Sequence, residues 1–187
     1  MLDTVKNAPV NGLDLAALGD MVEAIEADAG KAKAAFRVTT RWTGQTRSES
    51  VVDGFDLGGT RITRLHKIVA DEPCELLGRD SAPNPQELLM SAFNACIMVG
   101  YVAGASVKGI TLDSVEIETK GELDLRGFLG LRDDVAPGYE AIDYEVRIKG
   151  DGSEADFADI HRTVMKTSPN YFNMSRPIKM NGSLVVG

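Results

Sequence analysis

The chain has 187 residues, of which 43% are hydrophobic and 26% are charged. This composition is typical of a compact globular domain and excludes disordered, collagen-like and disulfide-scaffold proteins. Twenty basic and 28 acidic residues give a net charge of −8, which argues against nucleic acid or an anionic membrane surface as a partner.

The first 35 residues predict a helical extension. Apolar residues recur at three- and four-residue steps after Asp14, and Gly30 is a suitable helix stop. The N-terminus has neither the basic nor the apolar region of a signal peptide. We therefore expect a cytoplasmic protein whose two cysteines are reduced.

Three β-rich stretches follow, at residues 36–42, 47–57 and 60–69. Each is rich in β-branched or aromatic residues, and the first alternates apolar with polar side chains. Gly44 and the Gly58-Gly59 pair supply the turns between them. The pattern predicts an antiparallel meander.

A long apolar helix is predicted over residues 85–107. Asn84 suits the N-cap, Pro85 the first helical position, and Glu87 the third, where it completes a capping box. Residues 88–107 carry no charge and are long enough to span a bilayer. Polar residues within the stretch and strands on both sides favour a buried central helix instead.

Two further strands are predicted at residues 110–120 and near 142–149. The segment between them, 122–137, contains apolar side chains, which suggests a packed flap or a subunit contact (Leu125, Phe128, Leu129 and Leu131). A last helix is expected from Ser153 until Ser168-Pro169 ends it.

A C-terminal strand is expected to place four apolar residues on one side (Ile178, Met180, Leu184 and Val186). Residues 36–187 contain no linker and no repeat, so we predict a single α+β domain after the extension of residues 1–35.

Chemistry at a metal or nucleotide site is not indicated. The chain lacks the common phosphate-binding and metalloprotease motifs, and neither His66 nor His161 has ligand spacing to a cysteine. No cofactor and no metal are therefore expected. Cys96 is the main candidate for reactivity, although a buried cysteine without a cationic neighbour is an inert packing residue.

The run from Pro83 to Cys96, PNPQELLMSAFNAC, resembles the central-helix signature of the OsmC/Ohr superfamily. The order of the elements from Phe36 to Val186 is also similar. The resemblance implies an OsmC-like fold, in which an antiparallel sheet surrounds a long buried central helix. It also implies an intertwined homodimer with two active sites at the subunit interface.

In that superfamily the helix cysteine attacks an organic hydroperoxide, an arginine stabilises its thiolate, and a glutamate orients the arginine. The resemblance assigns these roles to Cys96, Arg47 and Glu87, with a solvated strand arginine as the alternative for Arg47. Gln86, however, holds the place of the glutamate in the hydroperoxide-reductase branch, and a capping role is the alternative for Glu87. Ser168 stands where the resolving cysteine is expected, and a serine cannot form a disulfide.

Two functions remain open. The first is thiol-dependent reduction of small hydrophobic hydroperoxides in oxidative stress defence, with Cys96 regenerated by an external thiol reductant. The second is a non-catalytic dimer that binds a small apolar ligand in its interface cavity. Leu125, Phe128 and Leu129 are candidates for the pocket wall, with plain packing as their alternative. Cys74 is either a replacement resolving thiol or an ordinary loop cysteine.

Overall fold

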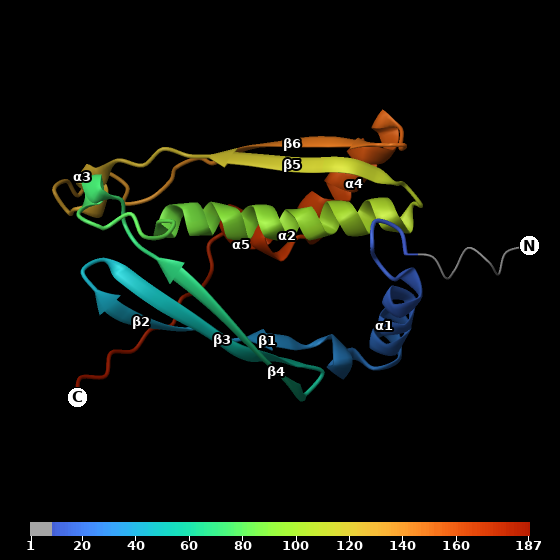
Figure 1. Cartoon of the computed structure of the whole chain (residues 1–187), viewed down its shortest axis with the longest axis horizontal. Coiled ribbons are helices and arrows are strands. Elements are labelled where there is room, and N and C mark those ends of the chain that lie inside the picture. The colour runs from blue at the N-terminus through green and yellow to red at the C-terminus, as the bar shows by residue number, and fades with distance from the viewer. Residues whose placement is uncertain (1–8) are drawn as a thin grey trace, which may run out of the picture. The chain divides into compact units, whose positions relative to one another are not determined.

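The computed structural model describes residues 9–187, which form two compact units that divide between Ser91 and Ala92 (Figure 1). The part of the expected extension that precedes residue 9 lies outside the described residues. The division expected at residue 35 stays a prediction.

The first unit begins with helix α1, Leu15–Ala27. The Asp14 side chain caps it by accepting a hydrogen bond from the backbone N–H of Ala17. The helix ends at Ala27 with Asp28 as its C-cap, one residue earlier than a stop at Gly30 implies. The Asp28 carboxylate accepts the Gly30 N–H and begins a short 3-10 turn, η1, Ala29–Ala32.

The predicted meander is confirmed as an antiparallel sheet. It consists of β1 (Ala34–Phe36), β2 (Thr39–Gly44), β3 (Arg47–Leu57) and β4 (Thr60–Ala70). Strand β3 is the centre: it pairs with β1 and β2 in succession along its length, and with β4. The stretch predicted as one first strand is thus two strands, broken between Phe36 and Thr39.

A buried carboxylate organises the loop after β4. Asp71 is 1% exposed. It accepts hydrogen bonds from Thr46 Oγ1 at 2.8 Å and Ser81 Oγ at 2.7 Å, and from three backbone N–H groups (Glu72, Arg79 and Ser81). The Ser81 and Thr46 hydroxyls hold the pKa of this carboxyl far below its usual range. The loop includes a 3-10 turn, η2, Cys74–Leu76.

Helix α2, Pro85–Val107, has the predicted bounds. Its residues Phe93, Ile97, Tyr101 and Ala105 recur every four positions and form the centre of the core of the second unit. The apolar sequence suggested a helix buried on all sides. Val99 is 68% exposed, however, so the helix buries one stripe of side chains and not its whole circumference. The length and apolar composition of α2 would be enough to cross a membrane, but the core helix of a globular protein can have the same length and composition.

Strands β5 (Leu112–Lys120) and β6 (Asp143–Gly150) form an antiparallel pair in the second unit. Apolar side chains on one face of the pair pack against the core, whereas charged ones alternate with them (Val115, Ile117, Tyr144, Val146 and Ile148 against Glu116, Glu118, Glu145 and Arg147). The segment that connects the two strands, residues 121–142, is called the flap and contains a short helix, α3, Leu125–Phe128.

Helix α4, Glu154–Thr167, begins with a capping box between Ser153 and Asp156. Its Ile160 and Val164 complete the core against α2. Ser168-Pro169 ends α4 as predicted but also starts a further helix, α5, Pro169–Ser175, which the sequence analysis missed. Pro169 suits this start because the first helical position needs no backbone N–H.

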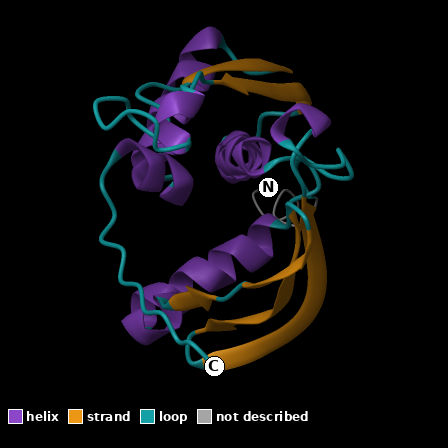
Figure 2. Cartoon of the chain, turned by 90° about the vertical axis from the view of Figure 1, so that its left-hand side faces the viewer, coloured by secondary structure: helices purple, strands orange, loops and turns teal. Residues whose placement is uncertain are grey.

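The C-terminal strand predicted near residues 178–186 is wrong for the structure described here, where the segment is loop (Figure 2). Met180, Leu184 and Val186 are all more than 80% exposed. A strand needs a neighbouring strand for its backbone hydrogen bonds, and none of the strands within residues 9–187 pairs with this segment.

Candidate active site

The strongest candidate for chemistry is the pair formed by Cys96 and Ser168. The Cys96 Sγ lies 3.4 Å from the Ser168 Oγ, although 72 positions separate the two residues in the chain. Cys96 is half-buried and Ser168 is 7% exposed. The serine is held at a helix junction: its N–H donates to Val164 O at the end of α4, and its Oγ accepts from the Tyr171 N–H of α5.

Close packing of α2 against α4 sets this distance. A Cβ on Gly100 would lie 2.9 Å from Val164 Cγ2, and one on Gly104 would lie 3.0 Å from Ile160 Cγ2. The absence of side chains at both glycines therefore lets the helices approach. Helix α5 is tied to α2 by the Asn170 side chain, which donates to the Ala92 carbonyl at 2.8 Å.

A hydroxyl beside a sulfur can donate to a thiolate or accept from a thiol, but it cannot form a disulfide. The two cysteines are free, and Cys74 lies in η2 of the other unit. In residues 92–187 the side chain that contacts Cys96 at the α4–α5 junction is thus an oxygen and not a second sulfur.

Arg47 is the first residue of β3 and is half-buried. Its guanidinium donates to Thr43 Oγ1 at 2.9 Å. The hydroxyl of the preceding residue, Thr46, donates a hydrogen bond to the buried Asp71 carboxylate, and this contact anchors the start of the strand. Arg47 belongs to the unit that ends at Ser91 and Cys96 to the other, so a role of Arg47 at the thiol stays a prediction.

Glu87 forms the predicted capping box at the start of α2. Its carboxylate accepts from the Asn84 N–H at 2.8 Å, and its own N–H donates to Asn84 Oδ1 at 2.9 Å. This arrangement satisfies two backbone donors that the first turn of a helix would otherwise leave without partners. The capping role is therefore confirmed, and the catalytic role stays a prediction.

Replacing Asn84 by alanine is expected to destabilise the protein by about 1 kcal/mol, because the helix loses its cap. This corresponds to a melting temperature lower by about 2–4 °C in a chain of this size. Thermal denaturation followed by circular dichroism measures the change. Asn84→Asp, which keeps an acceptor oxygen, serves as the control, and equal losses in both variants would contradict the capping argument.

The apolar residues predicted to line a substrate pocket lie in the flap. Leu125, Phe128 and Leu129 are 41%, 68% and 59% exposed. Leu125 borders a broad open hollow that the flap residues themselves surround. A pocket-lining role for Phe128 and Leu129 stays a prediction.

A second pocket in the same unit was not foreseen. It has a volume of about 290 Å³, and four aromatic side chains line it (Phe93, Tyr139, Tyr144 and Tyr171). These residues come from α2, the flap, β6 and α5, so no local sequence pattern brings them together.

Among residues 9–187, no group of three or more His, Cys, Asp or Glu side chains is arranged to hold a metal ion.

A family model described as OsmC-like protein matches residues 78–182, which is more than half of the chain and includes both Cys96 and Ser168. The chain belongs to the OsmC-like protein family. No match was found among curated proteins.

Solved OsmC-like structures share the fold. An OsmC-like protein from Mycoplasma pneumoniae is 17% identical, with a TM-score of 0.59 over 75% of this chain and 86% of that chain. An OsmC-like protein of unknown function from Vibrio cholerae O1 is 12% identical, with a TM-score of 0.55 over 73% and 91%. The expected α+β class with antiparallel sheets is therefore confirmed.

Proposed function

We propose that this OsmC-like chain reduces small hydrophobic organic hydroperoxides through Cys96, as a peroxidase with one catalytic cysteine. The observation that carries the proposal is the contact of 3.4 Å between the Cys96 Sγ and the Ser168 Oγ. It gives the half-buried sulfur a hydrogen-bonding neighbour in place of a second thiol. Family membership supports the choice of chemistry.

In the first step the Cys96 thiolate attacks the terminal oxygen of the hydroperoxide, the one that carries the hydrogen. An S–O bond forms, the O–O bond breaks, and the leaving alkoxide takes a proton to become an alcohol. Cys96 is then a sulfenic acid, which the adjacent Ser168 hydroxyl can hydrogen-bond but cannot reduce.

An external thiol completes the cycle because Ser168 offers no sulfur. The first thiol attacks the sulfenic sulfur, forms a mixed disulfide and releases water. A second thiol then attacks the mixed disulfide, which regenerates the Cys96 thiol and yields the oxidised reductant.

Arg47 is the proposed source of the positive charge that favours the thiolate, because a guanidinium stays protonated at all working pH values.

We also propose that two copies of the chain assemble into a homodimer. Support comes from the large apolar side chains that a single chain leaves in water, for example Phe36 at 72% exposure and Trp42 at 75%.

The decisive experiment compares the consumption of cumene hydroperoxide and of hydrogen peroxide by the wild type and by Cys96→Ser, with dithiothreitol as reductant. The proposal expects turnover that prefers the organic peroxide and is lost in Cys96→Ser. Cys74→Ser is the matched control and should keep the activity. Equal turnover in wild type and Cys96→Ser would overturn the assignment.

The second candidate function is ligand binding without turnover. The pocket lined by Phe93, Tyr139, Tyr144 and Tyr171, called the aromatic pocket from here on, favours it. A concave site lined mainly by aromatic and apolar residues is typical of ligand binding. This function predicts no peroxide consumption, and the same assay therefore separates the two candidates.

Replacing Arg47 by glutamine is expected to lower the reactivity of Cys96 toward an alkylating reagent about tenfold at neutral pH, because the thiolate loses its cation. Cys74→Ser is used as the background so that a single thiol reacts. Arg41→Gln is the matched control, since Arg41 lies in the neighbouring strand β2 and is exposed. Equal reactivity in the two arginine variants would remove Arg47 from the mechanism.

A further inference from the structure

The aromatic pocket lies entirely within the second unit. Besides Phe93, Tyr139, Tyr144 and Tyr171, five residues line it (Glu140, Ala141, Ile142, Met174 and Ser175). Its volume of about 290 Å³ is at the lower end of the range for ligand pockets, which suits a small molecule.

Two of the rings form a corner. The centroids of Phe93 and Tyr144 are 5.3 Å apart and their planes meet at 70°, so the walls they contribute face different directions. Phe93 is buried, and the Tyr144 hydroxyl donates to the Met165 Sδ at 2.8 Å, which fixes the orientation of its ring. Walls built from several rings in different planes are the feature by which proteins surround an organic cation.

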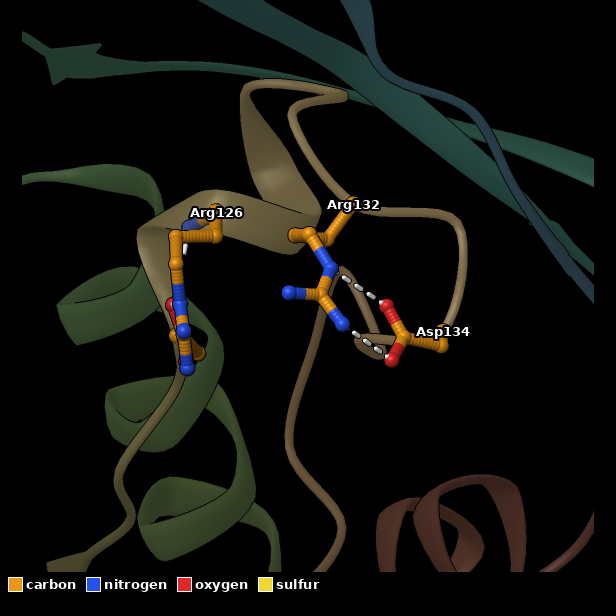
Figure 3. A network of polar contacts seen from close by, with 4 residues as sticks. Arg126, Arg132 and Asp134 are labelled. Carbon is orange, nitrogen blue, oxygen red and sulfur yellow. Dashed lines mark hydrogen bonds and ion pairs between the residues drawn. The ribbon is translucent and has the colours of Figure 1, made fainter.

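Glu140 supplies a carboxylate at the edge of this pocket. Two other flap carboxylates are neutralised by arginines: Asp134 pairs with Arg132 (Figure 3), and Asp124 pairs with Arg126. The Arg126 guanidinium lowers the pKa of Asp124 to about 2. No ion pair occupies Glu140 among residues 9–187, so its charge is available to a ligand.

We infer that the aromatic pocket binds a small organic cation with methyl groups on its nitrogen, of the quaternary ammonium class. The methyl groups would contact the rings, and the positive charge would be attracted both to the ring faces and to the Glu140 carboxylate. The inference does not rest on the peroxidase function, because Cys96 and Ser168 do not line the pocket.

Other ligand classes fit less well. An anion would meet Glu140 and no lysine or arginine among the lining residues. A neutral apolar ligand would carry no charge to interact with the Glu140 carboxylate. The net charge of −8 also favours the approach of cations over that of anions.

The test is isothermal titration calorimetry of the full chain with choline and with its neutral isostere, 3,3-dimethylbutan-1-ol. The inference expects choline to bind about tenfold or more tightly than the isostere. Glu140→Gln should weaken choline binding several-fold, and Tyr139→Leu, which keeps apolar bulk but removes a ring, should also weaken it.

Glu122→Gln is the matched control, because it removes the same charge from the same flap but from a residue that borders the adjoining hollow and not the aromatic pocket. Its affinity for choline should match that of the wild type, as should that of Cys96→Ser. Three results would each overturn the inference: no heat with millimolar choline, equal binding of the isostere, or equal effects of Glu140→Gln and Glu122→Gln.

Discussion

Replacing Ser168 by cysteine is expected to change the product of peroxide oxidation from a sulfenic acid on Cys96 to an intramolecular disulfide. The Ser168 Oγ already lies 3.4 Å from the Cys96 Sγ, and a modest side-chain rotation brings two sulfurs at these positions to bonding distance. A neighbouring thiol reacts as if it were present at very high concentration, so it should intercept the sulfenic acid before external reagents do.

The measurement is mass spectrometry after one equivalent of cumene hydroperoxide, with dimedone present to trap sulfenic acid. The Cys74→Ser background leaves Cys96 as the single native thiol. The background protein should form the dimedone adduct, whereas the added Ser168→Cys should reduce the adduct at least about tenfold and give a mass lower by two hydrogens.

Thr167→Cys is the control for this result. It places a thiol one residue earlier, where the native side chain bonds to the Thr163 carbonyl of its own helix. This variant should keep the dimedone adduct. A disulfide in both variants, or in neither, would contradict the geometry found at the α4–α5 junction.

Local signals account for what the sequence predicted well. The turn glycines of the meander and the cap of α2 act between residues close in the chain, so Asn84 and Glu87 could be paired from spacing alone. The strand pair β5–β6 was also visible, since alternation of apolar and charged side chains needs no knowledge of the partner.

Features that depend on distant residues were missed. The aromatic pocket combines α2, the flap, β6 and α5, and helix α5 was hidden because Ser168-Pro169 serves equally well as a stop and as a start. The C-terminal strand failed for the related reason that its alternation is real but no strand within residues 9–187 pairs with it. The contact of Cys96 with Ser168 was suggested by family resemblance and not by any local pattern.

The same dependence on distant contacts gives Gly100 its importance. Replacing Gly100 by alanine is expected to destabilise the protein by about 1–3 kcal/mol, although alanine is the better helix former. The added Cβ would lie 2.9 Å from Val164 Cγ2 and 3.2 Å from Val164 Cγ1. Val164 is 2% exposed, and a β-branched side chain in a helix strongly prefers one rotamer, so we expect α4 to shift away from α2.

Gly19→Ala is the matched control, because Gly19 lies within α1 and an added Cβ there has no atom within 4 Å. It should raise stability by about 0.5–1 kcal/mol through helix propensity alone. Urea denaturation of both variants separates propensity from packing. Ser168 lies one helical turn after Val164, and Cys96 lies one turn before Gly100, so the two contacts are neighbours between the same helices. A shift of α4 caused by Gly100→Ala should therefore also reduce disulfide formation in the Ser168→Cys background. A stabilised Gly100→Ala protein that still forms this disulfide would show that close packing of α2 and α4 does not set the distance at Cys96.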